Sequence, residues 1–299
     1  MPNIQNQTLP LVYYIMGTAR SGSTILEILL SNNDETFGAG ELTGLANDGL
    51  VENGECSCQA AVTECAIWGE VKKQLDLSKV QSRSWAKLQS SIDRHTGFFR
   101  HLFHLVSHTD LHSYGDLNLR LLSILKQCTG CSRLVDSSKY AGRALVLRKL
   151  LEEDSLFVIC LTRSPEGLMK AFQKQNKDEQ KSKSPFQVLF YYLGTLLSMR
   201  IACWKLGDSV IKIRYEDLMN DPNSALLKIS AHGGLDLTGT VAKVSNNEPF
   251  NVGHIVTGNR LRKNKSVIFR ETEDKKFHYS ISQWSLITLM NLWRWSLRF

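Results

Sequence analysis

A short segment rich in glycine and hydroxyl side chains carries the strongest chemical signal in this 299-residue chain. Residues 17–24 read GTARSGST, and their two glycines have the GxxxxG spacing of a phosphate-binding loop. The backbone N–H groups of such a loop, together with the positive end of the helix that follows it, bind an anion without requiring any particular side chain. The segment therefore predicts an anion site.

The loop lacks the lysine that nucleotide triphosphatases use. In those enzymes the residue after the second glycine is a lysine that reaches the β and γ phosphates, whereas here it is Ser23. The apolar run 157–161 is followed by Thr162 and Arg163 instead of an acidic residue that would hold Mg²⁺. The pattern favours a phosphorylated ligand over triphosphate cleavage, and a P-loop kinase is the alternative.

The elements that must position this loop alternate between strands and helices. Short apolar runs predict buried strands at residues 11–16, 134–135, 157–161 and 210–213. Residues 23–31 predict a buried helix after the loop, and the stretch from about 68 to 126 is helical in its periodicity. We therefore expect an α/β protein with a P-loop-like three-layer fold, in which a central parallel sheet and a helical insertion at about 68–126 form a single domain over residues 1–299.

The charge balance also favours an anionic ligand. The chain has 36 basic and 29 acidic residues, a formal net charge of +7, and its arginines and lysines are dispersed instead of gathered in stripes with aromatic residues. We expect a small anion and no nucleic acid as partner, with a non-catalytic nucleotide-binding module as the alternative of another class. No leader pattern and no uninterrupted apolar run of about 18 residues is found, so we expect a cytoplasmic protein without a membrane partner.

Two groups of metal-ligand residue types fall outside the familiar metal motifs. Four histidines have helical spacing: His101, His104, His108 and His112. No HExxH pattern accompanies them. Three cysteines, Cys56, Cys58 and Cys65, form CxCx₆C, which lacks the paired CxxC spacing of a structural zinc site. We therefore predict no metal site, and interpret the cysteines as a local staple or as small buried side chains.

Five segments together resemble the PAPS-dependent sulfotransferases, especially their carbohydrate, tyrosylprotein and bacterial branches. The first is RSGSTIL from Arg20, followed 21 residues after Arg20 by Glu41 within GAGEL. The others follow in the family's order: VDSSKYAGRAL from Val135, LTRSPEGLMKAF from Leu161, IRYEDLMNDP from Ile213 and GHIVTGNRLR from Gly253. The resemblance spans about residues 11 to 270. It implies a sulfotransferase that uses 3'-phosphoadenosine-5'-phosphosulfate (PAPS), releases PAP and requires no metal.

The resemblance also implies cofactor-binding residues. It assigns the 5'-phosphosulfate to Thr18, Ala19, Arg20, Ser21, Gly22, Ser23 and Thr24. Arg163 stands where the family binds the 3'-phosphate, but the serine that the family commonly has eight residues later is Ala171 here. Ser164, Arg260 or Arg262 could supply the missing contact. Tyr215 resembles a family tyrosine that helps to bind the nucleotide, and a packing role in a strand is its alternative.

Three residues are predicted to carry the chemistry. A neutral hydroxyl is a poor nucleophile, so the acceptor needs a base. We predict Glu41, which resembles the catalytic glutamate of the tyrosylprotein branch and follows Gly38 and Gly40, two glycines that imply a turn; the alternative is a helix-capping carboxylate. Arg20 is predicted to stabilise the leaving phosphate, and Lys139 to contact the sulfate or the acceptor.

The expected acceptor is a hydroxyl or amino group of a small molecule. The resemblance to bacterial natural-product sulfotransferases points to a secondary metabolite such as an alkaloid, and a carbohydrate is the alternative acceptor.

Overall fold

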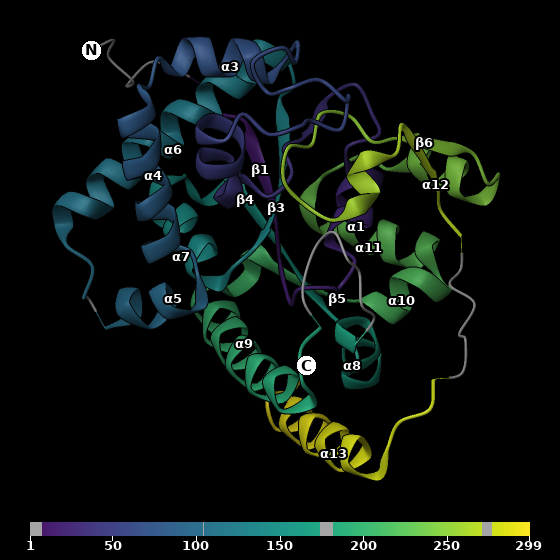
Figure 1. The fold of residues 1–299 in the computed structure, drawn as a ribbon. Coiled ribbons are helices and arrows are strands. Elements are labelled where there is room, and N and C mark those ends of the chain that lie inside the picture. Colours follow the sequence, from purple (N-terminus) through teal and green to yellow (C-terminus); the bar gives the residue numbers. More distant parts are fainter. Residues whose placement is uncertain (1–7, 104, 174–181, 271–276) are drawn as a thin grey trace.

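A parallel sheet of five strands forms the centre of the molecule, with helices on both of its faces (Figure 1). The computed structural model describes residues 8–103, 105–173, 182–270 and 277–299. The strands run in the order β2-β3-β1-β4-β5, and they are β1 (Leu11–Gly17), β2 (Thr36–Gly38), β3 (Arg133–Lys139), β4 (Leu156–Thr162) and β5 (Val210–Arg214). The predicted α/β fold with a central parallel sheet is confirmed. The strand β2, which has three residues, was not predicted.

Strand β1 lies in the middle of the sheet and is apolar on both faces. Val12, Tyr14 and Met16 pack into the core on one side, and Tyr13 and Ile15 pack into the core on the other, all five with no exposed surface. Successive side chains of a strand point to opposite faces, so a continuous apolar run requires helices over both. This arrangement explains why β1 has no alternating polar pattern.

The insertion consists of helices, as predicted. They are α3 (Trp68–Leu75), α4 (Lys79–Ile92), α5 (His95–Leu102) and α6 (His108–Thr129). The four spaced histidines do not share one helix, because a new helix begins after Ser107, whose side chain caps α6 by accepting a hydrogen bond from the backbone N–H of Asp110. The side chains of His101 and His104 lie outside the described part of the structure, and His108 and His112 are exposed.

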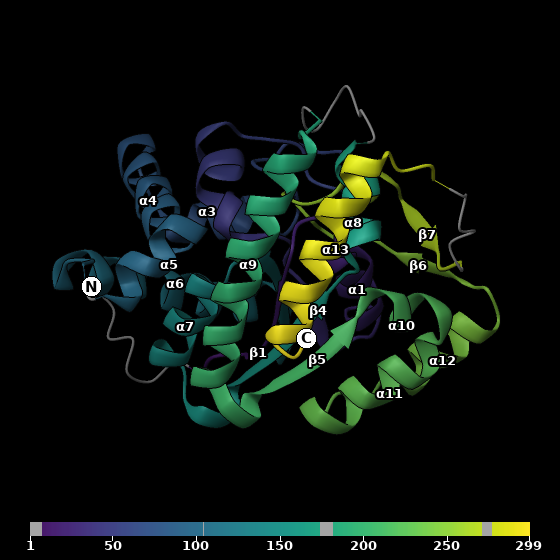
Figure 2. The same ribbon diagram turned by 90° about the horizontal axis from the view of Figure 1, so that it is seen from below.

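The remaining elements flank the sheet or join its strands. Helices α1 (Ser23–Leu30), α2 (Leu42–Gly44), the π-helix η2 (Leu45–Val51), α7 (Ala141–Leu150), α8 (Pro165–Gln173) and α9 (Pro185–Leu206) precede β5. After β5 follow α10 (Tyr215–Asn220), α11 (Pro222–Gly233), α12 (Thr238–Ser245), the antiparallel pair β6 (Pro249–Asn251) and β7 (Ser266–Ile268), and α13 (Ile281–Ser296). Helices α9 and α13 lie side by side (Figure 2).

Helix α9 is the one described helix that is long and apolar enough, by length and composition, to cross a membrane. Half of its apolar window is buried inside the molecule, where α9 packs against α7 and α13. Gln187 and Arg200 interrupt the run in the sequence.

A buried arginine joins the insertion to the sheet. Nε of Arg143 donates to Oδ2 of Asp136 at 2.7 Å, and Nη1 donates to the hydroxyl of Tyr114 at 2.8 Å and to Oδ1 of Asn118 at 2.9 Å. Oδ2 of Asp93 lies 3.6 Å from Nη1. Burial raises the pKa of Asp93 to about 7, although the guanidinium lowers it. This network fixes α4, α6 and α7 against β3.

The same network orders the carboxyl end of β3. Oδ1 of Asp136 accepts hydrogen bonds from the backbone N–H of Ser138, at 3.0 Å, and from its hydroxyl. The ladder with β1 is irregular between Tyr14 and Met16, and Lys139 adopts a left-handed φ of 73°. Arg143 therefore acts, through Asp136, on the position of Lys139.

A buried glutamate holds the turn before Glu41. Glu27 on α1 has no exposed surface; its Oε2 accepts from the hydroxyl of Ser137 at 2.7 Å, and its Oε1 accepts from the backbone N–H of Gly40. Gly40 has a φ of 73°, and a Cβ there would lie 2.8 Å from the carbonyl oxygen of Thr257, so only glycine fits. Burial raises the pKa of Glu27 to about 8.

We predict that Arg143→Ala lowers the free energy of unfolding by about 3–5 kcal/mol, because the carboxylates of Asp136 and Asp93 lose their buried cation. The matched control is Arg148→Ala, which removes an arginine paired with Glu153, a residue whose side chain is 83% exposed. That control should cost at most about 1 kcal/mol in urea unfolding. Equal losses in the two variants would contradict the role of the network.

We also predict a pH-dependent difference between wild type and Glu27→Gln. The folded protein keeps a proton on Glu27 up to about pH 8, whereas the usual pKa is 4.5, so this group's contribution to stability is full below pH 4.5 and is lost as the pH rises through about 8. The wild type should therefore lose unfolding free energy relative to Glu27→Gln between about pH 5 and about pH 9. Parallel profiles, like those expected for the exposed-carboxyl control Glu152→Gln, would refute this.

Candidate active site

The GTARSGST segment forms the turn between β1 and α1, as predicted. Two of its residues have left-handed backbone, with φ values of 64° at Arg20 and 89° at Gly22. A Cβ on Gly22 would lie 2.5 Å from the ring of Tyr215, so the contact with that ring requires glycine. Loops of this shape direct successive backbone N–H groups into a concavity that suits an anion.

Buried hydroxyls in the loop have unused hydrogen-bonding capacity. Oγ1 of Thr18 and Oγ of Ser21 are buried and have no hydrogen-bond partner among the described residues. Thr24 uses its hydroxyl, which accepts from the backbone N–H of Asn259 at 3.3 Å, and Ser23 is buried in the first turn of α1. Buried polar atoms without partners are rare in folded proteins, so Thr18 and Ser21 fit a ligand rich in hydrogen-bond acceptors.

Strands β1, β4 and β5 bring three of the predicted residues together. The guanidinium carbon of Arg163 lies 4.3 Å from the centre of the Tyr215 ring, and Nη1 of Arg163 donates to the carbonyl oxygen of Arg20 at 2.5 Å. Arg163 follows β4 and Tyr215 follows β5, and these parallel strands pair up to Thr162 and Arg214. Nε of Arg163 is buried without a partner in the described structure. The carboxyl edge of the sheet thus gathers cationic and aromatic groups beside the loop.

The residues predicted to compensate for Ala171 differ in the contacts that they already make. Ala171 lies on α8. Oγ of Ser164 accepts from the backbone N–H of Gly167 at 3.1 Å, which leaves the Ser164 hydroxyl proton to donate. Nη1 of Arg262 donates to the carbonyl oxygen of Glu55 at 2.7 Å, so this side chain contacts the loop that contains the cysteines. Arg260 is exposed on the 3₁₀ turn Arg260–Lys263.

Glu41 and Lys139 form an ion pair beside the loop. Their side chains are 26% and 16% exposed, so both can reach a bound molecule. The backbone N–H of Glu41 donates to the carbonyl oxygen of Thr257 at 3.1 Å, and the hydroxyl of Thr257 donates back to the carbonyl of Glu41 at 2.5 Å. Glu41 precedes α2, yet its carboxylate makes no capping hydrogen bond. The lack of this hydrogen bond argues against the capping alternative.

Two residues at the site were missed by the sequence analysis. The hydroxyl of Tyr191, on α9, accepts from the backbone N–H of Ala19 at 2.6 Å, and burial raises its pKa to about 12, so it is neutral at physiological pH. Thr257 anchors Glu41 as described above. Tyr191 lies in an apolar helix whose pattern indicates only packing. Thr257 lies within the segment GHIVTGNRLR, which could have pointed to it.

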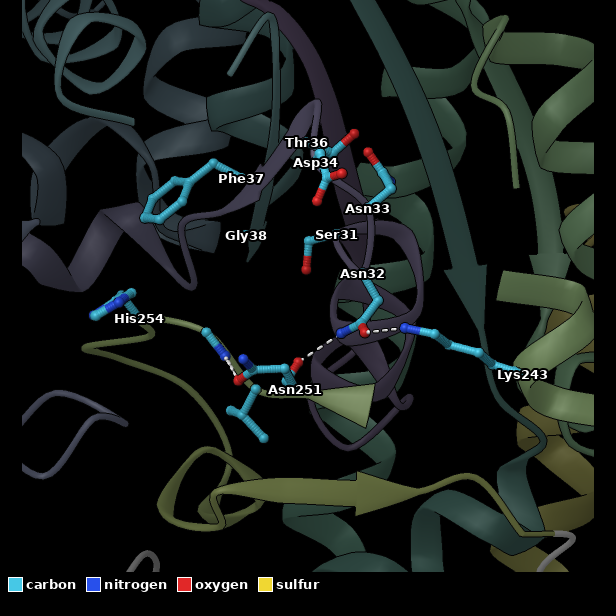
Figure 3. Close-up of a pocket in the computed structure, with 12 residues that line it drawn as sticks. Ser31, Asn32, Asn33, Asp34, Thr36, Phe37, Gly38, Lys243, Asn251 and His254 are labelled. Atoms are coloured by element: carbon cyan, nitrogen blue, oxygen red, sulfur yellow. Dashed lines mark hydrogen bonds between the residues drawn. The ribbon is translucent and has the colours of Figure 1, made fainter. Parts of the chain in front are cut away.

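A surface cavity of about 280 Å³ opens beside β2 (Figure 3). Nδ2 of Asn32 donates to the carbonyl oxygen of Asn251 at 2.7 Å, and Nζ of Lys243 donates to Oδ1 of Asn32 at 3.3 Å, which closes one wall. None of the residues that line it belongs to the predicted cofactor or catalytic set. The predicted residues therefore gather at the carboxyl edge of the sheet and do not line this cavity.

Comparison with known proteins bears on the resemblance drawn from the motifs. The sulfotransferase family matches residues 13–239 of this chain. No curated protein sequence matches it.

Several solved structures are similar to this one. The sulfotransferase domain from the curacin biosynthetic pathway is 18% identical, with a TM-score of 0.48, and the similarity covers 96% of this chain and 99% of that one. The sulfotransferase STF9 from Mycobacterium avium is 14% identical, with a TM-score of 0.49 and coverages of 82% and 69%. Mouse sulfotransferase SULT7A1 complexed with PAP is 10% identical, with a TM-score of 0.46 and coverages of 94% and 82%.

The family match confirms the relationship that the five segments indicated. It begins within β1, includes the phosphate loop and reaches into α12, so it covers both Arg20 and Arg163. Because the match extends over well more than half of the chain, the protein belongs to the sulfotransferase family.

Proposed function

We propose that this enzyme transfers a sulfuryl group from PAPS to a hydroxyl or amino group of a small molecule. The observation that carries the proposal is the grouping of Arg163, Tyr215 and the backbone of Arg20 beside the phosphate loop, with the Glu41–Lys139 pair next to it. Cations, an aromatic face and an anion-binding loop are the groups that a bis-phosphorylated adenosine needs.

Binding of the cofactor is supported by residues whose hydrogen-bond donors are not used within the protein. The hydroxyls of Thr18 and Ser21 and the backbone of the loop would hold the 5'-phosphosulfate. Arg163 would bind the 3'-phosphate through nitrogens left over after its contact with Arg20, with Ser164 in place of the serine absent at Ala171. Tyr215 would hold Arg163 in place by its cation–π contact.

For the chemistry, Glu41 would take the proton of the acceptor as the acceptor attacks sulfur in line with the leaving phosphate. Lys139, which pairs with Glu41, would neutralise charge on the sulfuryl oxygens. Arg20 would stabilise the negative charge that builds on the phosphate as the sulfur–oxygen bond breaks, an effect that is greatest in the transition state. None of these steps is assigned to a metal ion.

For the acceptor, we extend the proposal to a bacterial secondary metabolite such as an alkaloid. A cationic amine would be attracted to the partly exposed carboxylate of Glu41. We place the enzyme in the cytoplasm, since none of its seven cysteines forms a disulfide, which suits a reducing compartment.

We predict that Arg163→Ala weakens PAP binding by about 10- to 150-fold in calorimetric titration, because a charged hydrogen-bond donor to the ligand is lost. The matched control is Arg214→Ala, which removes an equal charge from the end of β5, where that arginine is half exposed. The control should bind PAP nearly as the wild type does. Equal losses in both variants, or a preference for ATP with Mg²⁺ over PAP, would refute the PAPS proposal and favour the kinase alternative.

We predict that Glu41→Gln lowers kcat by about 10²- to 10⁴-fold for transfer from PAPS to a simple phenol, because the general base is lost. Its PAP affinity should stay near that of the wild type, since the loop is unchanged. Glu52→Gln, at an exposed position nearby in the sequence, is the control. A Glu41→Gln variant with unchanged kcat would exclude this carboxylate as the base.

A further inference from the structure

Three cysteines and one histidine converge at a place that the proposed reaction does not use. The sulfur atoms of Cys56, Cys58 and Cys65 and a ring nitrogen of His254 all lie within 4.8 Å of one another. Cys56 and Cys65 are buried, His254 is partly buried and Cys58 is exposed, and all three thiols are free. Figure 3 shows His254 at the edge of the cavity beside β2.

The spacing of these atoms is close to that of a tetrahedral zinc site. Sγ of Cys56 and Sγ of Cys65 are 3.7 Å apart, and two thiolates at zinc–sulfur distances of about 2.3 Å would be about 3.8 Å apart. Nδ1 of His254 lies 3.2 Å from Sγ of Cys65 and 3.9 Å from Sγ of Cys56. A sulfur and a nitrogen atom bound to one tetrahedral zinc ion would be about 3.6 Å apart. One of the two observed distances is shorter than this value and the other is longer.

The backbone around the cysteines is already shaped to present them. The N–H of Cys56 donates to the carbonyl of Ala60 at 2.9 Å, and the N–H of Gln59 donates to the carbonyl of Cys56 at 2.8 Å. Gln59 has a left-handed φ of 71°, which closes a tight turn around Cys58. The N–H of Cys65 donates to the carbonyl of Ala61 at 2.9 Å and ends the loop. The backbone of this loop is therefore already ordered, and a bound ion would order it little further.

The histidine is held by a second set of contacts. Nε1 of Trp68 donates to the carbonyl oxygen of His254 at 2.6 Å. The hydroxyl of Ser57 donates to the carbonyl of Gly253 at 2.6 Å and accepts from the N–H of Ile255 at 2.8 Å, so both neighbours of His254 are fixed to the cysteine loop. These contacts fix the main chain that carries the His254 ring against the cysteine loop.

We propose that Cys56, Cys58, Cys65 and His254 bind one structural Zn²⁺ ion, with Nδ1 of His254 as the fourth ligand. Three cysteines and one histidine form a closed structural zinc set, with no position left for water or substrate. A disulfide between Cys56 and Cys65 is the competing chemistry for these thiols. It would use two of the four groups and would leave Cys58 and His254 without a shared role.

The ion would tie the cysteine loop to a segment that reaches the active site. Three residues beyond His254, the carbonyl of Thr257 accepts from the N–H of Glu41, and two residues further on the N–H of Asn259 donates to the hydroxyl of Thr24. The ion therefore stabilises the edge that carries Glu41, without touching the reacting atoms. Binding of the metal itself does not depend on the proposed transfer reaction.

The first measurement is the zinc content of the full chain purified without chelator. We expect about one zinc per chain in elemental analysis, and a loss of at least about tenfold in Cys56→Ser, Cys65→Ser and His254→Ala. Cys131→Ser, which removes a partly exposed cysteine outside the cluster, is the control and should keep its zinc. His254→Cys should also keep the metal, because four cysteines are an equally good zinc set.

A second measurement keeps the test independent of variants that fail to fold. Wild-type protein stripped by a chelator and reloaded with Co²⁺ should show the visible absorption of tetrahedral cobalt together with thiolate-to-cobalt charge transfer. Its Tm should fall on stripping and recover when zinc is added.

Two results would overturn the proposal. The first is wild-type protein that holds no zinc and takes up no cobalt, with a Cys56–Cys65 disulfide in the mass spectrum of the unreduced chain. The second is zinc retained at the wild-type level by Cys56→Ser, Cys65→Ser and His254→Ala alike.

Discussion

Arg143 is only 1% exposed, and a buried charge is tolerated only when all of its partners are present at once. Asp136 comes from the sheet, Asp93 follows helix α4 of the insertion, and Tyr114 and Asn118 belong to α6. These contacts select one packing of the insertion against β3. The end of β3 that carries Lys139 depends on this choice, since Asp136 also binds Ser138 directly before Lys139.

The main chain at Glu41 is held from two sides by different physical means. On one side Glu27, a buried acid, binds the backbone N–H of Gly40 and the hydroxyl of Ser137. On the other side Thr257 makes two hydrogen bonds to the main chain of Glu41 itself. The side chain of Glu41 is left to Lys139, so the main chain is fixed while the charged group stays accessible.

Sequence reasoning succeeded where the signal is local. The strand, loop and helix from residue 11 to residue 30 were predicted because an apolar run, two spaced glycines and a second apolar run follow one another directly. Strand β2 was missed because three residues are too few to show the alternating pattern of a strand. The histidine spacing misled because periodicity does not show that Ser107 starts a new helix.

The long-range parts of the site could not be derived in this way. His254 lies 189 positions from Cys65, and no spacing rule connects a single histidine to a distant CxCx₆C segment. The contact of Tyr191 with Ala19 spans 172 positions, and the sequence pattern of α9 does not indicate it. The resemblance to sulfotransferases placed Arg20, Arg163 and Tyr215 in one site, but only the structure shows that they touch.

The contact of Tyr215 with Gly22 has a consequence for ligand selectivity. The Tyr215 ring lies against Gly22 of the phosphate loop and also against the guanidinium of Arg163, which in turn donates to the carbonyl oxygen of Arg20. A group that displaced Arg163 would therefore disturb both the ring and the backbone of the loop. A single nucleotide that carries both phosphates would bind with a favourable coupling free energy between its two phosphates. Two separate mononucleotides would gain less. If the enzyme binds PAPS as proposed, the ring and the loop would together favour a nucleotide with two phosphates over singly phosphorylated adenosine.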